Sequence, residues 1–211
     1  MSYITTHPTE VALLFVQHCA LVGTALAIAL VIALPLGIFA ARSARFATPL
    51  YGTLAAIYTI PSLALLALIV WWFGLGFWPT VIALVAYAQF VLARNIATGV
   101  RGVPEAQVDA ARGLGMTSLQ RLLRVELPLA MPVILGGVRI AVVAMIALAT
   151  LGGYVNAGGL GVLIFRGLDS SYTAQTLAGS IPAALLAIAA DLLFRGLERR
   201  SLRHLEPSEV K

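Results

Sequence analysis

The stretch VALLFVQHCALVGTALAIALVIALPLGIFAA, residues 11–41, decides the fold, because it contains no Asp, Glu, Lys or Arg. A second uncharged stretch extends from Phe46 to Ala93. Both are too long for the core helices of a small soluble domain, and a helix needs only about 20 apolar residues to cross a bilayer. In the whole chain 11% of the residues are charged, whereas soluble domains average about 25%. We therefore predict an all-α integral membrane protein.

Five membrane spans fit this pattern. The uncharged stretch from Phe46 to Ala93 is too long for one crossing. The sequence WWFGLGFWP at residues 71–79 interrupts it with glycines, a proline and aromatic residues that suit the membrane interface. The predicted spans are residues 11–41, 54–73, 80–97, 129–151 and 174–194, all within one transmembrane domain, residues 1–211. An odd number of spans places the two termini on opposite sides of the membrane.

The basic residues predict which side is the cytoplasm, because Lys and Arg accumulate in cytoplasmic loops. With the N-terminus outside and the C-terminus in the cytoplasm, twelve of the 14 basic residues lie on the cytoplasmic side. They are Arg42, Arg45, Arg94, Arg101, Arg112, Arg121, Arg124, Arg195, Arg199, Arg200, Arg203 and Lys211. The formal charge of +5 therefore reflects membrane orientation and does not indicate nucleic-acid binding.

The cytoplasmic segment 101–128 begins with a predicted helix and a turn. Pro104 and Glu105 suit the first turn of a helix, since proline fits there and an acidic group favours the positive helix end. Gly113 and Gly115 then interrupt the helix with a tight turn that needs positive φ at one of them. A loop of uniform polarity would indicate a disordered linker, whereas this pattern predicts ordered structure.

A second short helix, residues 118–125, is predicted after the turn. Thr117 is a suitable N-cap for it, and the helix runs to Leu127-Pro128. On the first helix, Ala110 and Ala111 make a thin face, which would let the backbone of another protein approach closely. The segment therefore has the form of a docking element.

The spacing within this segment resembles the EAA loop of bacterial ABC importer permeases. Asp109-Ala110-Ala111 is followed after three residues by Gly115, and after nine more by Val125-Glu126-Leu127-Pro128. Asp109 stands where that family usually has Glu, and Val125 where it usually has Ile. The resemblance implies a type I ABC importer permease fold with a cytoplasmic coupling helix. It assigns the contact with the ATPase to Glu105, Asp109, Ala110, Ala111, Gly113, Gly115, Leu127 and Pro128.

Further stretches resemble the glycine betaine, carnitine and choline branch of these permeases. They are residues 58–65 (YTIPSLAL), 121–128 (RLLRVELP), 157–161 (AGGLG) and 164–168 (IFRGL). Asn156 and Val162 depart from the branch, which often has Gly and Asp there. Candidate pathway residues are Tyr58, Pro61, Ser62 and Asn156.

The chain lacks the means to use ATP or a metal itself. Its only lysine is Lys211, so no P-loop with its phosphate-binding lysine exists. The three histidines, His7, His18 and His204, have no metal-ligand spacing. No cofactor and no catalytic site are expected, and ATP with Mg²⁺ is assigned to a partner. The resemblance implies three partners: a cytoplasmic ABC ATPase dimer, a second permease copy or sister permease, and an extracytoplasmic substrate-binding protein.

Several alternatives stay open. The same architecture could serve an amino acid such as methionine, or the chain could be a channel or scaffold without an ATPase. Arg139 and Asp191 lie within spans, where a charge costs about 2.5–3.5 kcal/mol on insertion scales. Arg139 either belongs to the pathway, snorkels toward the membrane surface or pairs with Asp191. Aromatic residues of the stretch 71–79 form either an interface belt or a cation–π cage; they are Trp71, Trp72, Phe73 and Trp78.

Overall fold

The computed structural model describes residues 2–203, and throughout this range the regular elements are helices. In chain order they are α1 Ser2–Thr6, α2 Pro8–Arg42, α3 Ala44–Thr59, α4 Ser62–Phe73, α5 Phe77–Arg101, α6 Glu105–Gly113, α7 Ser118–Arg121, a π-helical segment Leu122–Glu126, α8 Leu127–Ala149, a 3₁₀ helix Thr150–Val155, α9 Gly161–Asp169 and α10 Thr173–Arg203. His204 and Lys211 lie outside the described residues.

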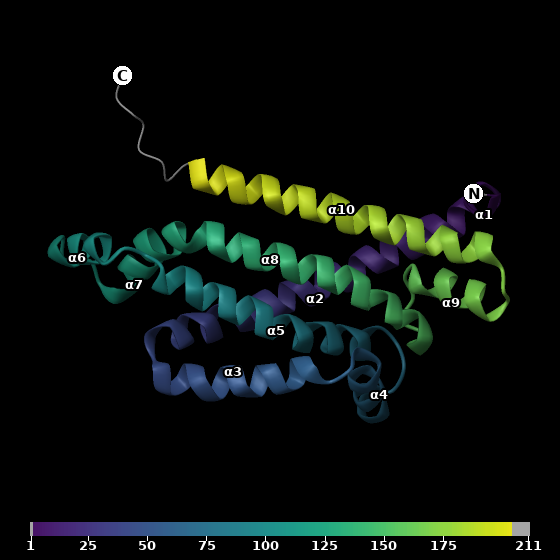
Figure 1. The fold of residues 1–211 in the computed structure, drawn as a ribbon, viewed down its shortest axis with the longest axis horizontal. Coiled ribbons are helices and arrows are strands. Elements are labelled where there is room, and N and C mark those ends of the chain that lie inside the picture. Colours follow the sequence, from purple (N-terminus) through teal and green to yellow (C-terminus); the bar gives the residue numbers. More distant parts are fainter. Residues whose placement is uncertain (1, 204–211) are drawn as a thin grey trace, which may run out of the picture.

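The long helices form an elongated bundle. Figure 1 shows α2, α5, α8 and α10 running lengthwise beside one another, with α6 and α7 at one end and α1 and α9 at the other. Four helical stretches are long and apolar enough to cross a membrane: Pro8–Arg42, Phe77–Arg101, Ser118–Val155 and Thr173–Leu202. They contain the predicted spans 11–41, 80–97, 129–151 and 174–194. The bent pair α3–α4 makes a fifth if it counts as one span.

Small residues allow the central helices to pack closely. Ala25, Ala29 and Ala33 repeat every four residues on one face of α2 and are fully buried. At Gly37 the backbone lies so close to α5 that an added Cβ would collide with Ile96. Without water between helices in a bilayer, association depends on such van der Waals packing, which small residues favour. The extensive contact of α2 with α5 follows from this face, and α5 in turn packs on α8.

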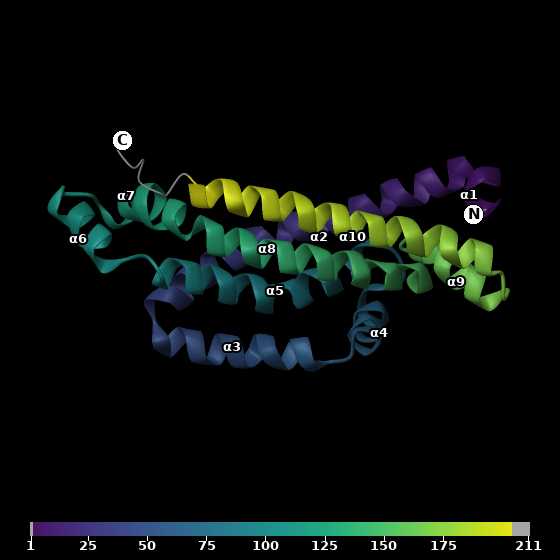
Figure 2. The ribbon, with the colours of Figure 1, turned by 45° about the horizontal axis from the view of Figure 1, so that its top comes forward.

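The predicted span over residues 54–73 is broken within its length. The chain bends by 97° between α3 and α4, and Figure 2 shows α4 lying across the direction of α3. Pro61 explains the break, because proline has no N–H to donate and disfavours helical backbone in the residue before it. Ile60 accordingly has extended φ and ψ of −64° and 129°. The helical stretch before the break also starts earlier than predicted, at Ala44.

The second short helix of the 101–128 segment does not end at Leu127-Pro128, as the sequence suggested. It continues through the π-helical segment into α8, so that Ser118–Val155 is one helical stretch. The N–H of Leu127 donates to the carbonyl of Leu122, five residues earlier. Pro128 follows directly and offers no N–H, so the wider π turn absorbs the change of hydrogen-bond register at the proline.

Candidate functional site

Two regions contain most of the predicted site residues: the 101–128 segment at one end of the bundle and a cavity at the α3–α4 break. In the segment, Gly115 has φ of +75°, so the prediction of positive φ at one of the two glycines is confirmed. Thr117 caps α7, its side chain accepting from the N–H of Gln120 while the Gln120 side chain accepts from the N–H of Thr117. These two features set the direction in which α7 leaves the turn.

The surface of residues 105–126 combines one ion pair with apolar groups. Asp109 and Arg112 form an exposed pair, 2.8 Å between oxygen and nitrogen. Leu114, Leu119 and Leu123 are 77%, 64% and 56% exposed. We call these three residues the leucine patch. Sequence reasoning missed it, because a lone exposed leucine is common in proteins and the sequence did not show that these three side chains stay exposed.

The two alanines of the predicted docking face differ in their surroundings. Ala110 is exposed, whereas Ala111 is 3% exposed and therefore packs inward. The expectation that both present a thin face to a partner is wrong for Ala111, because adjacent residues on a helix point about 100° apart. Glu105, Gly113 and Pro128 are exposed, and Leu127 is half-buried.

A buried carboxylate ties this segment to the first long helix. Glu126, in the π-helical segment, is 6% exposed. Its Oε1 accepts from Arg121 Nε at 2.7 Å, and its Oε2 accepts from Arg42 Nη2 at 2.9 Å. Hydrogen bonds between ionised groups are short and strong. The three side chains therefore fix the base of the α6–α7 segment to the end of α2.

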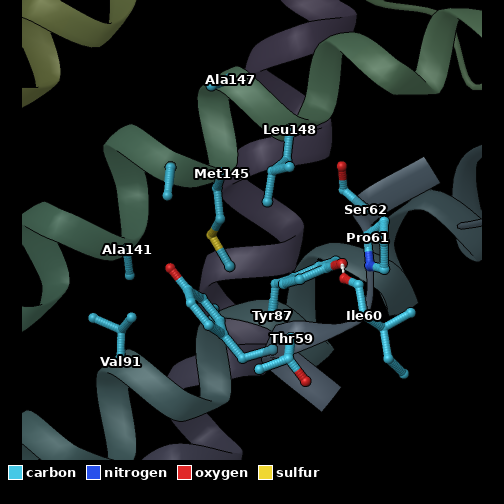
Figure 3. A pocket seen from close by; sticks show the side chains of 13 residues that line it. Thr59, Ile60, Pro61, Ser62, Tyr87, Val91, Ala141, Met145, Ala147 and Leu148 are labelled. Carbon is cyan, nitrogen blue, oxygen red and sulfur yellow. Dashed lines mark hydrogen bonds between the residues drawn. The ribbon is translucent and has the colours of Figure 1, made fainter. Parts of the chain in front are cut away.

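The cavity at the α3–α4 break has a volume of about 460 Å³. Its lining comes from α3, α4, α5 and α8 and includes three of the four predicted pathway residues, Tyr58, Pro61 and Ser62. The hydroxyl of Tyr87 donates to the carbonyl of Ile60, which the break leaves without a helical donor. Figure 3 shows this bond beside Pro61, with Met145 of α8 on the other side of the cavity. The polar side chains of the described lining are hydroxyl groups only.

Aromatic rings connect this cavity to a second one. The ring of Tyr58 lies 5.9 Å from that of Tyr87 and 5.3 Å from that of Phe90, between centroids. Phe90 lines a neighbouring cavity of about 540 Å³ between α3 and α5, together with Arg94 and Arg101. The guanidinium carbon of Arg94 lies 5.9 Å from the Phe90 centroid. The Tyr58–Phe90 ring contact therefore links a residue that lines the first cavity to a residue that lines the second.

Asn156 lies apart from the other candidate pathway residues. It is exposed and ends the 3₁₀ helix in a left-handed conformation, φ 58° and ψ 27°, which asparagine tolerates better than most residues. The following loop packs on α2, where the N–H of Gly159 donates to Gln17 Oε1 at 3.2 Å. An added Cβ at Gly159 would come within 3.0 Å of His18 Nδ1. The structure therefore gives Asn156 a place in a packed turn and not in the cavity.

The charges within the spans pair with one another. Arg139 Nε lies 3.8 Å from Asp191 Oδ1, and its Nη1 lies 3.8 Å from Glu198 Oε2. Of the alternatives left open for Arg139, the structure shows the pairing with Asp191, although Asp191 lies nearer to Arg195, at 2.9 Å. Trp71, Trp72 and Trp78 are 62–80% exposed, as an interface belt requires. In residues 2–203 no group of three or more His, Cys, Asp or Glu side chains could hold a metal ion.

Comparisons with known proteins place this arrangement among importers. Residues 33–203 match the family described as "binding-protein-dependent transport system inner membrane component". The carnitine transport permease protein OpuCB of Listeria monocytogenes is 39% identical over 184 residues, which cover 87% of this chain and 84% of that protein. The glycine betaine/carnitine/choline transport system permease protein OpuCD of Bacillus subtilis is 39% identical over 186 residues, covering 88% and 81%. An inward-facing structure of the MetNI methionine ABC transporter has a TM-score of 0.81 at 19% identity, covering 92% of this chain and 98% of that one.

Proposed function

Because the chain belongs to the family of binding-protein-dependent transport system inner membrane components, we propose that it moves quaternary-amine osmoprotectants into the cell as the permease of an ABC importer. The observation that supports this most is the likeness, at 39% identity over most of both chains, to permeases named for carnitine, glycine betaine and choline. The chain is a non-catalytic, multi-pass membrane component. ATP and Mg²⁺ are used by a separate ATPase.

The α6–α7 end of the bundle is the end that docks on the ATPase dimer. Its leucine patch supplies apolar surface for a groove, and the Asp109–Arg112 pair supplies polar rim contacts, a combination usual in protein interfaces. The Glu126 ion pairs would carry movement of the docked segment to α2. In this arrangement the α6–α7 end lies in the cytoplasm and α1 lies outside, where the substrate-binding protein delivers its ligand. The positive-inside rule supports the same orientation.

The cavity at the α3–α4 break is part of the translocation pathway. Broken helices at membrane depth are tolerated where they line a cavity, and transporters place substrate sites beside them. Tyr58 and Ser62 flank this break, and Tyr87 stabilises it. A second copy of the chain or a sister permease completes the pathway from the other side.

The test is transport by the assembled importer. The permease, its cognate ATPase and its binding protein are reconstituted in liposomes, and uptake of radiolabelled glycine betaine, carnitine, choline and methionine is measured with and without ATP. ATP-dependent uptake of a quaternary amine supports the proposal. Uptake of methionine alone would favour the amino-acid alternative, which rests on a likeness of fold at 19% identity. Flux that needs neither ATP nor the ATPase would indicate a channel.

A further inference from the structure

Three side chains on one face of α5 lead from the aromatic cavity to the basic one. Tyr87, Phe90 and Arg94 stand at helical spacings of three and four residues, so they share a face. From Tyr87 to Arg94 this face covers about 10 Å along the helix axis. Tyr58 of α3 faces it, with its ring 5.9 Å from Tyr87 and 5.3 Å from Phe90.

The two ends of this face suit groups of opposite charge. Aromatic rings attract a quaternary ammonium through the negative face of the π system. An arginine stays protonated at any physiological pH and binds carboxylates through two parallel N–H donors. Arg101, which lines the same cavity, already donates to the carbonyls of Ala40 and Ala41. Arg94 makes no hydrogen bond or ion pair within residues 2–203, and its guanidinium carbon lies 5.9 Å from the centroid of the Phe90 ring.

We propose that Tyr58, Phe90 and Arg94 form a two-point site for zwitterionic quaternary amines. The trimethylammonium group lies against the rings of Tyr58 and Phe90, and the carboxylate binds the guanidinium of Arg94. Glycine betaine and carnitine carry both groups, whereas choline ends in an uncharged hydroxyl. The permease itself therefore favours the carboxylated substrates, after any selection by the binding protein. This inference rests on the proposed function.

The experiment compares uptake of carnitine with uptake of choline by the reconstituted importer. Each substrate is supplied already bound to the binding protein, at a concentration that saturates the importer. Arg94→Gln should lower the carnitine-to-choline uptake ratio on the order of tenfold, the size of losing a hydrogen bond to a charged group. Using the ratio cancels differences in the amount of inserted protein. Arg45→Gln is the matched control, because Arg45 is also an exposed arginine and lines neither cavity. It should leave the ratio unchanged.

The aromatic half is tested with Tyr58→Leu and Phe90→Leu, which remove the π system and keep an apolar side chain. Both should lower uptake of carnitine and choline together and leave their ratio near the wild-type value. An unchanged ratio in Arg94→Gln, or full uptake of both substrates in the two leucine variants, would overturn the two-point site. If the wild-type importer moves none of glycine betaine, carnitine and choline, the proposed function itself fails, and this outcome is measured without any variant.

Discussion

Gly115 is the residue whose backbone sets the geometry of the α6–α7 segment. Its φ of +75° is costly for any residue with a Cβ, and most of all for a β-branched one. No atom lies within 4 Å of a Cβ placed there, so the cost of a substitution is backbone strain and not a clash. We expect Gly115→Val to add roughly 1–3 kcal/mol of strain, to redirect α7 and to abolish ligand-stimulated ATP hydrolysis by the importer.

Gly113 provides the control for that prediction. It lies at the helical end of α6, also in open space, and lacks the positive φ. Gly113→Ala should therefore keep membrane insertion and should lower stimulated hydrolysis less than Gly115→Val does, because it adds no backbone strain. Wild-type hydrolysis in Gly115→Val would show that the turn does not control coupling.

Glu126 should contribute to stability through its two arginine partners. Glu126→Gln removes the charge that neutralises Arg121 and Arg42, whose side chains are 14% and 39% exposed. We expect a loss of about 1.5–3 kcal/mol, the range for hydrogen bonds to charged groups, with the exposed Arg42 contributing the smaller part. Denaturation of the purified permease in detergent measures this loss in the free energy of unfolding. Asp109→Asn breaks an ion pair that is 57–59% exposed and should change stability by less than about 1 kcal/mol; equal losses would refute the buried-charge explanation.

The sequence could predict features that depend on neighbouring residues in the chain. It could not predict contacts with residues that are distant in the sequence. The conformation of Gly115 and the cap at Thr117 follow from a turn between two short helices. The sequence left open whether Arg139 pairs with Asp191, because that partner lies on another helix. Phe90 and Arg94 gave no signal, since their importance depends on Tyr58 lying opposite them after α3 folds back.

At the scale of elements, the break between α3 and α4 depends on a bond across to α5. Tyr87 supplies the donor that Ile60 loses at the break. Tyr87→Phe leaves this carbonyl without a partner, at a cost of roughly 1–3 kcal/mol. We expect a lower thermal unfolding temperature and slower transport.

Tyr58→Phe is the control for Tyr87→Phe. It removes a hydroxyl from the same cavity, keeps the ring, and breaks no hydrogen bond recorded among residues 2–203. It should therefore unfold at the wild-type temperature. If both variants unfold like the wild type, the break is held by Pro61 alone.

Hydropathy predicted where the long helices lie, because burial in a bilayer constrains composition over about 20 residues at a time. It could not predict how α3 and α4 are arranged, since both halves of residues 54–73 are equally apolar. Pro61 was visible in the sequence, but a proline in a span can kink, bend or break a helix depending on what satisfies the freed carbonyl. Pro128 shows the opposite outcome, because the π turn before it keeps the helix continuous.

At the scale of the whole molecule, the orientation of the bundle is open to a direct test. The native cysteine, Cys19, is first replaced by alanine, and single cysteines are placed at Thr5, Ser171 and Ser118. In intact cells a membrane-impermeant maleimide should modify Thr5→Cys and Ser171→Cys, which lie at the end opposite α6 and α7. It should spare Ser118→Cys until the membrane is opened. The reverse pattern would contradict the proposed orientation and the charge bias behind it.

The surface of α4 indicates that one copy of the chain is incomplete. Of its twelve residues only Leu66 is buried, although nearly all are apolar. The helix also borders the cavity that we assign to the pathway, through Ser62. Five crossings at most are too few to enclose a pathway, and a pair of ATP sites needs a pair of docking segments. We therefore expect two permease copies, or this chain with a sister permease, bound to two ATPase subunits.

Native mass spectrometry of the importer, released from detergent with its subunits intact, measures the stoichiometry. Two permease masses per two ATPases are expected, equal in a homodimer and unequal with a sister chain. A complex of one permease with one ATPase that retains ATP-dependent transport would show that a single chain encloses the whole pathway.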